Sequence, residues 1–317
     1  MVKRTLGRSG IAVGTLALGG NVFGWTIDEK TSFQILDAFV DSGLNLIDTA
    51  NMYSAWVSGH QGGESETIIG RWLQTSGKRD KVILATKVGL PMGDGSQGLK
   101  RDYILRAVDE SLQRLQTDRI DLYQSHQDDL ETPLEETLAA YEVLIKQGKI
   151  RAIGASNYKA DRLQLAMEIS AREKLPAYVC LQPEYNLYDR QDFEEHLRPI
   201  CEQYELGMIG YYSLAAGFLS GKYRSAADLG KSARGAGIGT KYLNERGFRI
   251  LAALDELAAL HQTVPAVIAL AWLIHQPAVT APIASATSLE QLQDLIKATQ
   301  LSLSSADLEK LNQASAA

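Results

Sequence analysis

Four polar residues with complementary chemistry lie at or just after the ends of apolar segments. They are Asp48 after LNLI, Tyr53 five positions later, Lys87 after VILAT and His126 after IDLYQS. A phenol has an unperturbed pKa of about 10, so Tyr53 needs a neighbouring ammonium that lowers this pKa before it can work near neutrality. Lys87 could be that ammonium, and Asp48 could hold it ionised. A histidine could orient a carbonyl oxygen by a hydrogen bond. Such a set suits proton donation to a carbonyl that receives a hydride.

Each of these residues also has an ordinary explanation when it is considered alone. An aspartate can cap a helix, a tyrosine can be a half-buried ring, a lysine can be a surface ammonium and a histidine can be a satisfied core residue. Four of them at successive strand ends are harder to explain in this way, because the carboxyl ends of parallel strands in a barrel converge on one rim. The pattern therefore predicts a shared pocket.

The elements that would position this pocket alternate regularly along the chain. Several strand-like segments lack polar alternation, which is typical of parallel strands covered on both faces. The segments are LALG near residue 17, LNLID near 45, VILATKV near 82, IDLYQSH near 120, IRAIGAS near 150, VCLQPEY near 179, LGMIGYY near 206 and AVTAPIA near 278. Helical patterns cover residues 31–42, 64–74, 102–116, 133–147, 159–173, 191–202, 245–261 and 289–298. Eight such units predict an α/β fold, a (β/α)8 TIM barrel that forms a single domain over residues 1–317. An open doubly wound sheet is the structural alternative.

Three segments depart from this alternation. Residues 3–13 predict an N-terminal β-hairpin with Ser9 and Gly10 in its turn. Residues 263–276 predict an extra helix. Residues 221–244 are long for a connection in a barrel, which predicts a lid or a cofactor clasp.

Composition narrows the class of protein. The 317 residues carry 32 basic and 38 acidic side chains, a formal charge of -6, without the basic stripe that nucleic-acid binding needs. Two cysteines, Cys180 and Cys201, cannot form a disulfide framework and indicate a reducing compartment. No run approaches the roughly 18 apolar residues of a membrane span, and the early apolar run lacks a small-x-small cleavage pattern. We therefore expect a cytoplasmic protein without nucleic-acid or membrane partners.

Other motifs in the chain carry less weight. The spacing of GDGSQG at residues 93–98 matches a dinucleotide-binding turn, but Pro91 and Met92 separate it from the preceding strand. Residues 230–232 resemble the end of a phosphate-binding loop, but they lack its first glycine and a preceding strand. The remaining histidines, which are scattered over predicted helices and loops, are His60, His196, His261 and His275. We therefore expect no metal site.

Several motifs, in sequence order, resemble those of the aldo-keto reductases. They are LNLIDTANMYS with GESETIIGRWL, ILATKVG, IDLYQSHQDD, IRAIGASNY and LQPEYNL, and the resemblance runs from Leu6 to about Leu295. It implies an oxidoreductase that interconverts carbonyl compounds and alcohols by hydride transfer with a nicotinamide cofactor. It also implies that the four residues above form the catalytic set, with Tyr53 as the general acid/base.

The resemblance further implies where the cofactor lies. Residues similar to those that bond the nicotinamide carboxamide are Ser156, Asn157 and Gln182, which could otherwise cap strand ends. The ring-stacking tyrosine corresponds to Tyr211, with Tyr212 as the other candidate. Glycines that allow close approach and two cations mark the pyrophosphate segment, which comprises Ser213, Leu214, Gly217, Leu219, Ser220, Gly221, Lys222 and Arg234. The adenosine end would contact Ser285, Thr287, Gln291 and Asp294, and the nicotinamide ribose would lie near Gly20 and Asn21.

One departure from the family's pattern concerns the choice of cofactor. Many members carry a basic residue in the C-terminal segment that pairs with the 2′-phosphate of NADP. Residues 285–294 contain none, and Leu295 replaces an asparagine often found near the adenine. We expect NADP on the basis of Lys222, Arg234 and nearby hydroxyls, and NAD is the open alternative.

The substrate side of the pocket is the least specific part of the sequence. Residues near the strand ends that could line it are Trp25, Trp56 and Gln127. Aromatic walls suit a small-molecule carbonyl substrate without selecting one. Potassium-channel beta subunits share this barrel and its motifs, so a non-catalytic or regulatory nicotinamide-binding subunit is the alternative function. A barrel isomerase or a metal-dependent hydrolase would need a phosphate site at the last strands or a cluster of metal ligands.

Overall fold

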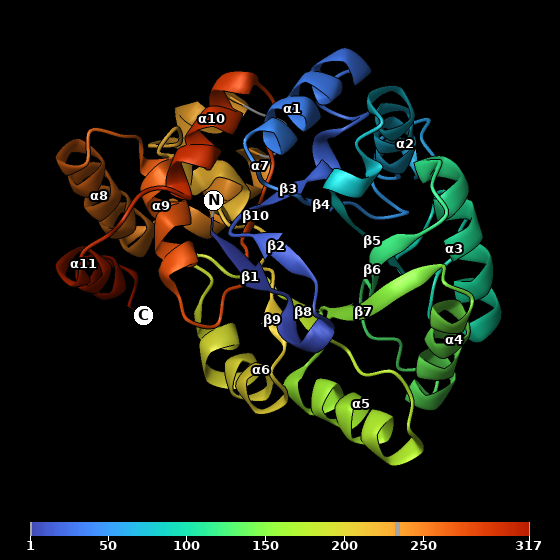
Figure 1. Cartoon of the computed structure of the whole chain (residues 1–317). Coiled ribbons are helices and arrows are strands. Elements are labelled where there is room, and N and C mark those ends of the chain that lie inside the picture. The colour runs from blue at the N-terminus through green and yellow to red at the C-terminus, as the bar shows by residue number, and fades with distance from the viewer. Residues whose placement is uncertain (1, 232–234, 317) are drawn as a thin grey trace.

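The computed structural model describes residues 2–231 and 235–316, and a ring of parallel strands lies at its centre (Figure 1). The strands are β3 (Ala17–Gly19), β4 (Leu46–Asp48), β5 (Ile83–Val88), β6 (Ile120–Ser125), β7 (Ile150–Ser156), β8 (Cys180–Gln182), β9 (Gly207–Met208) and β10 (Ile283–Ala284). Their order is β10-β3-β4-β5-β6-β7-β8-β9. The ring closes where the N–H of Thr280 donates to the carbonyl of Met208 and that of Ile283 to Gly210, both at 2.8 Å. The predicted (β/α)8 barrel is confirmed, and the open sheet is excluded.

The register of the strands brings their carboxyl ends to one rim. Asp48 pairs with Gly19 on one side, Lys87 pairs with Gln124, and Ser156 lies opposite Gln182. All of these pairings are parallel. Side chains that follow or end the strands therefore face the same region of space, as the alternation of elements predicts.

Helices surround the ring because each presents an apolar stripe to it (Figure 1). In α3 (Arg101–Leu115), Ile104, Ala107, Val108 and Leu115 are buried at helical spacing. The other helices that follow strands of the ring close to their predicted bounds are α1 (Glu29–Asp41), α2 (Glu64–Ser76), α4 (Leu134–Lys146), α5 (Ala160–Glu173), α8 (Glu245–Leu260) and α10 (Leu289–Ala298). The predicted extra helix is α9 (Pro265–His275), whose apolar side chains are buried on nearly every side.

The segment predicted as one helix over residues 191–202 is more complex. A π-helical turn, Phe193–Leu197, precedes α6 (Arg198–Tyr204). Pro199 has no N–H, and its ring would clash with a carbonyl one turn earlier in a regular α-helix. The N–H of Arg198 reaches back to the carbonyl of Phe193 instead. The proline therefore widens this turn locally.

The predicted N-terminal hairpin is present at one end of the barrel. Strands β1 (Lys3–Thr5) and β2 (Ala12–Gly14) pair antiparallel, and Gly10 has the left-handed φ of 71° that the turn requires. In Figure 1 the hairpin lies across the ring. Its apolar side chains join the core inside the barrel; they are Leu6, Ile11 and Val13.

Two α-helices and a 3-10 segment occur where no helix is predicted. Residues 221–244, predicted as a lid or clasp, contain a 3-10 segment, Ala226–Lys231, and α7 (Gly235–Tyr242). Near the C-terminus, α11 (Ser305–Ser315) begins with a capping box, in which Ser304 and Asp307 bond each other's backbone N–H groups. The helix packs against α8 and α9, where the Arg246 guanidinium donates to the carbonyl of Ser315 at 2.7 Å.

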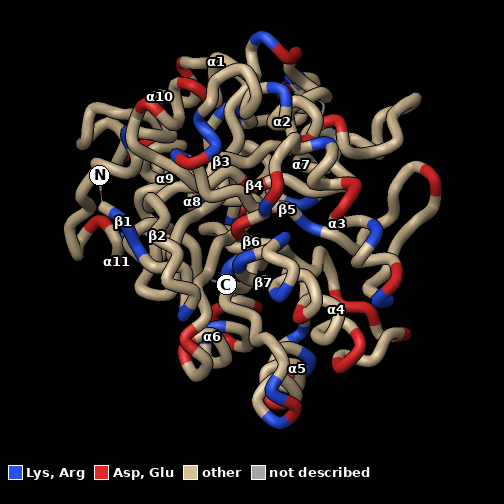
Figure 2. Tube along the Cα trace, turned by 45° about the vertical axis from the view of Figure 1, so that its right-hand side comes forward, with Lys and Arg blue, Asp and Glu red and all other residues tan. Residues whose placement is uncertain are grey.

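The outer surface mixes charges of both signs. Figure 2 shows Lys and Arg next to Asp and Glu on the outer helices, and some of these residues pair, as Arg71 does with Glu29 at 2.7 Å. Within the described residues no single helix is both long and apolar enough to cross a membrane. The helices α8 and α9, bent by 97°, would meet that test only as a pair, by length and composition.

Candidate active site

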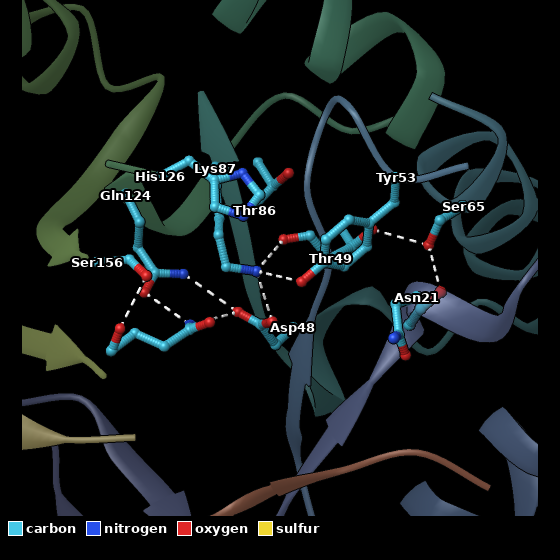
Figure 3. A network of polar contacts seen from close by, with 12 residues as sticks. Asn21, Asp48, Thr49, Tyr53, Ser65, Thr86, Lys87, Gln124, His126 and Ser156 are labelled. Carbon is cyan, nitrogen blue, oxygen red and sulfur yellow. Dashed lines mark hydrogen bonds and ion pairs between the residues drawn. The ribbon is translucent and has the colours of Figure 1, made fainter. Parts of the chain in front are cut away.

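The polar residues at the carboxyl ends of β4 to β8 meet inside one rim of the barrel. Asp48 ends β4, Lys87 lies in β5, and the loops after β4 and β6 carry Tyr53 and His126. Figure 3 shows these side chains directed toward one another, although they come from separate strands and loops. The structure thus brings together the four residues that the sequence grouped.

The Lys87 ammonium lies at the centre of this group and is fully buried. Its Nζ donates to Asp48 Oδ2 at 2.6 Å, to the backbone carbonyl of Thr49 at 2.8 Å and to the hydroxyl oxygen of Tyr53 at 2.8 Å. An ammonium has three N–H donors and no acceptor, so these three contacts use all of them. The Tyr53 oxygen accepts from Lys87 and therefore keeps its own hydrogen for a further acceptor.

The charges in the group follow from burial and from these contacts. Burial disfavours the Lys87 ammonium, but the Asp48 carboxylate and Tyr53 outweigh burial and raise the pKa of Lys87 above its ordinary value. Burial raises the pKa of Tyr53, and the opposing charge of Lys87 does not fully cancel this effect. The expectation that Lys87 brings the Tyr53 pKa below its ordinary value is therefore wrong for this structure. Tyr53 is a protonated phenol at neutral pH.

His126 provides a neutral polar group next to Tyr53. The two ring centroids are 6.0 Å apart, and His126 is 8% exposed. Burial, with a smaller contribution from the positive charge of Lys87, holds the pKa of His126 well below its usual range. Within the described part of the chain, its buried Nδ1 has no hydrogen-bond partner. The imidazole is therefore neutral near pH 7, when it can donate one N–H and accept at the other nitrogen.

The second oxygen of Asp48 is bonded by two glutamine amides. Gln124 Nε2 donates to Asp48 Oδ1 at 3.1 Å, and Gln182 Nε2 donates to the same oxygen at 3.0 Å. The backbone carbonyl of Gln182 accepts from Ser156 Oγ at 2.7 Å. Gln124 carries no signal in the sequence, because the strand IDLYQS is buried at every position and shows no alternation.

A cavity of about 930 Å³ opens beside these residues. Its wall includes Asp48, Tyr53 and His126, whereas Lys87 lies behind them. Most of the predicted cofactor residues line it: Asn21, Ser156, Asn157, Gln182, Tyr211, Ser213, Leu214, Gly217, Ser220, Lys222, Ser285, Thr287, Gln291 and Asp294. The predicted substrate residues Trp25 and Trp56 also line it.

A few of the predicted cofactor and substrate residues are not found in the wall of the cavity. Gly20 does not line the cavity, and its carbonyl accepts from Ser65 Oγ at 2.8 Å. Leu219 is fully buried in the core. Gly221 ends a 3-10 turn with a φ of 79°, and Gln127 is exposed outside the cavity. Arg234 lies outside the described residues.

The two adjacent tyrosines after β9 differ in how they are held. The hydroxyl of Tyr211 donates to Asn157 Oδ1 at 2.7 Å, and Asn157 in turn donates to the carbonyl of His126 at 2.9 Å. Tyr212 is 48% exposed. Both rings line the cavity, and they contact each other edge to face with centroids 5.2 Å apart. The better anchored ring is the one that the sequence favoured for stacking.

The loop after Tyr211 has an unusual backbone. Tyr212, Ala215 and Ala216 have φ values of 52°, 48° and 56°, followed by Gly217 at 101°. Side chains other than glycine rarely adopt this left-handed region. Nothing in the sequence signals it, because alanine normally favours a right-handed helix. The loop lines the cavity through Ala216 and Gly217.

Aromatic rings form the wall next to Tyr53. Trp25 and Trp56 meet edge to face with centroids 5.4 Å apart, and Tyr53 lies 6.0 Å from Trp56. Trp56 is 46% exposed. This wall can pack against an apolar or aromatic part of a ligand near the Tyr53 hydroxyl.

Comparison with known proteins agrees with this architecture. Residues 10–316 match the model of the "Aldo/keto reductase family". The uncharacterized oxidoreductase YrpG of Bacillus subtilis (strain 168) is 37% identical over 97% of this chain and 94% of its own length. L-glyceraldehyde 3-phosphate reductase of Escherichia coli (strain K12) is 31% identical over 99% and 92%, and a probable voltage-gated potassium channel subunit beta of Arabidopsis thaliana is 31% identical over 95% and 92%. The chain belongs to the aldo/keto reductase family.

Proposed function

We propose that this protein reduces aldehydes and ketones to alcohols with NADPH, and that Tyr53 donates the proton. The observation that carries the proposal is the hydrogen bonding of Lys87, whose three donors are all used. It leaves the Tyr53 O–H hydrogen available in the wall of the cavity, next to the neutral His126. A carbonyl oxygen placed between Tyr53 and His126 would find two donors.

The residues of the site would act in a simple order. When bound, the nicotinamide supplies a hydride to the carbonyl carbon. Tyr53 transfers its O–H proton to the carbonyl oxygen, so that the product is the alcohol and Tyr53 becomes a tyrosinate. Lys87 stabilises that anion at 2.8 Å, and Asp48 keeps Lys87 charged. A proton from water then restores Tyr53. His126 donates one N–H to the same oxygen and orients it.

The residues present fit a nicotinamide dinucleotide. A volume of about 930 Å³ is near the upper end of the range for ligand pockets, so it has room for a long ligand and a small substrate. Gln182 and Asn157 line the cavity and lie close to the catalytic residues, since Gln182 bonds Asp48 and Asn157 bonds the carbonyl of His126. The ring of Tyr211 offers a stacking surface next to Asn157, and glycine and serine residues continue along the wall.

The choice between NADPH and NADH depends on few charges. Lys222 is the cation among the described residues of the cavity wall. Asp294 also lines the cavity, and Lys297 pairs with it at 2.8 Å. We propose that Lys222, together with Arg234, favours NADPH because these cations attract the negative charge of its additional 2′-phosphate, which NADH lacks. Use of NADH is the alternative.

The test is the loss of reduced-nicotinamide absorbance with NADPH and then NADH, against a panel of small aldehydes and ketones. The Tyr53→Phe variant should lose roughly 10²-fold or more in turnover, because it lacks the proton donor. Its dissociation constant for the cofactor should stay close to that of the wild type. Tyr141→Phe is the matched control, since Tyr141 is a fully buried ring bonded to Ser125 outside the cavity. A Tyr53→Phe protein that retained most of its turnover would exclude the assigned role.

A regulatory nicotinamide-binding subunit is the second candidate function. Similarity to the potassium channel subunit of Arabidopsis thaliana favours it. This function predicts tight binding of NADPH with no turnover of any carbonyl in the panel. Turnover at rates typical of enzymes would exclude it as the sole function.

A further inference from the structure

Two buried glutamines are hydrogen-bonded to each other as well as to Asp48. Gln182 Nε2 donates to Gln124 Oε1 at 3.0 Å, in addition to its bond with Asp48 Oδ1. Gln124 is fully buried and Gln182 is 2% exposed. The three side chains form a closed triangle of hydrogen bonds, and Figure 3 shows two of its members, Asp48 and Gln124, next to Lys87.

The Asp48 carboxylate determines which way both amides point. An ionised carboxylate only accepts hydrogen bonds, and its Oδ2 already accepts from Lys87. Each glutamine must therefore turn its NH2 group, and not its carbonyl oxygen, toward Oδ1. The two N–H donors of Gln182 are then used by Asp48 and Gln124. Within the described residues, Gln182 Oε1 has no hydrogen-bond partner, and Gln182 lines the cavity.

We propose that Gln124 is a positioning residue, which locks the Gln182 amide so that Gln182 Oε1 faces the cavity as an acceptor. The matching ligand group is an amide N–H donor, which the carboxamide of a nicotinamide ring provides. This inference rests on the proposed function, because it requires a nicotinamide cofactor in the cavity. Gln124 itself does not line the cavity, so it acts only through Gln182 and Asp48.

The arrangement also links the two halves of the site. One oxygen of Asp48 bonds Lys87, which bonds the proton donor Tyr53, and the other oxygen bonds the two glutamines. The same carboxylate thus orders the group that would supply the proton and the group that would hold the nicotinamide ring. A substitution at Gln124 should therefore affect binding of the nicotinamide ring more than proton donation by Tyr53, since Lys87 keeps all its contacts.

The experiment compares the affinities for two ligands, NADP⁺ and its analogue with a 3-acetylpyridine ring. The analogue replaces the carboxamide by an acetyl group, so it lacks the N–H donor but keeps the rest of the molecule. Dissociation constants follow from quenching of tryptophan fluorescence, since Trp25 and Trp56 line the cavity. We expect the wild-type protein to bind NADP⁺ roughly fivefold more tightly than the analogue, the effect of about one net hydrogen bond.

The Gln124→Met variant keeps the length of the side chain and removes its polar atoms. We expect its preference for NADP⁺ over the analogue to fall to less than about twofold, because the Gln182 amide keeps its bond to Asp48 but loses the acceptor of its second N–H and can rotate. A purely structural loss would weaken both ligands equally and leave the ratio unchanged, and that result would overturn the proposal. Ser125→Ala is the matched control: it removes a buried polar group of the same strand, bonded to Tyr141 and Tyr178, and should keep the ratio.

The Gln124→Glu variant tests the same point without a loss of volume. Next to Asp48, a glutamic acid side chain should take up a proton. The protonated form offers one donor and one acceptor, as Gln124 does, so the preference for NADP⁺ should return at low pH and weaken as the side chain ionises. A pH-independent ratio equal to that of the wild type would contradict the role of Gln124. Wild-type protein that binds neither ligand would refute the proposed function instead.

Discussion

At the residue scale, the behaviour of the site depends on one buried ammonium. Lys87 opposes the effect of burial on the pKa of Tyr53, and Asp48 and Tyr53 keep Lys87 charged although it is fully buried. Proton donation in the reduction requires the phenol form of Tyr53. Because the pKa of Tyr53 is raised, the rate of reduction should be constant through neutral pH and should fall only as the pH rises through that pKa.

Removal of the ammonium tests this account. In Lys87→Met, burial and Asp48 would raise the pKa of Tyr53 further, and the tyrosinate formed in the reaction would lose its counter-ion. We expect turnover to fall by roughly 10²-fold or more, measured as kcat with NADPH and an aldehyde. Lys78→Met, which removes ion pairs with Asp37 and Asp41 at positions that do not line the cavity, should keep the wild-type kcat. Equal kcat in both variants would contradict the role of Lys87.

The depressed pKa of His126 has a consequence for stability. The folded state keeps His126 neutral, whereas the unfolded chain binds a proton below about pH 6.5. The unfolded state therefore binds more protons, and stability is lost as the pH falls below that value. Urea unfolding at pH 7, 6 and 5 should show a smaller loss in His126→Gln than in the wild type. An identical loss in both proteins would show that His126 does not contribute to the pH dependence of stability. The control variant is His196→Gln, which changes a histidine at an exposed position.

Sequence alone predicts some of these residues and not others, for a physical reason. Asp48 and Lys87 are polar groups at the ends of apolar strands, and parallel topology forces such ends together. Gln124 lies inside a strand that is buried on both sides, so no pattern shows which way it faces. Whether the pKa of Tyr53 rises or falls depends on the balance between burial and the charge of Lys87. The spacing of residues in the sequence does not reveal that balance.

At the element scale, the loop after β9 stores strain next to the cavity. Ala216 has φ 56° and ψ 17°, a conformation that raises the free energy of a residue with a Cβ by about 1–2 kcal/mol. Ala216→Gly should remove this strain, partly offset by about 0.5–1 kcal/mol of backbone entropy. We expect a net gain of roughly 0.5–1 kcal/mol and a higher Tm.

A glycine in an ordinary helix should have the opposite effect. Ala252 is an exposed position in the middle of α8, so Ala252→Gly should lower the free energy of unfolding by about 1 kcal/mol. Calorimetry on both variants separates the two cases. A decrease in Tm for Ala216→Gly similar to that for Ala252→Gly would mean that the left-handed conformation carries no strain.

The helices and strands could be predicted where the apolar runs and helical patterns in the sequence are long. The strands of the ring are apolar runs between helical patterns. The helices α1 and α10 are preceded by Asp28 and Ser288, whose side chains cap them by accepting from backbone N–H groups of the first turn. The helix α7 was missed because its sequence, GAGIGTKY, is rich in glycine. The π-helical turn before α6 follows from a single proline, whose effect on a helix is local.

At the scale of the whole molecule, α11 ties distant parts of the chain together. Asn312 Oδ1 accepts from the indole N–H of Trp272 at 3.1 Å and from the Arg190 guanidinium at 3.0 Å. Arg190 also stacks over the Trp272 ring, 4.8 Å from its centroid. A single side chain of α11 thus connects α9 with the loop that follows β8.

Loss of that side chain should weaken the fold without changing the chemistry of the site. In Asn312→Ala, the fully buried Trp272 loses the acceptor of its N–H, and an unsatisfied buried donor lowers stability by about 1–3 kcal/mol. Gln313→Ala removes only an exposed bond to Glu309 and should change stability by less than about 0.5 kcal/mol. Urea unfolding measures the difference, and kcat with NADPH should be unchanged in both variants at a temperature where both are folded. Equal stabilities would mean that the link through Asn312 does not hold α11 to the barrel; a selective loss of kcat would mean that the helix acts on the site.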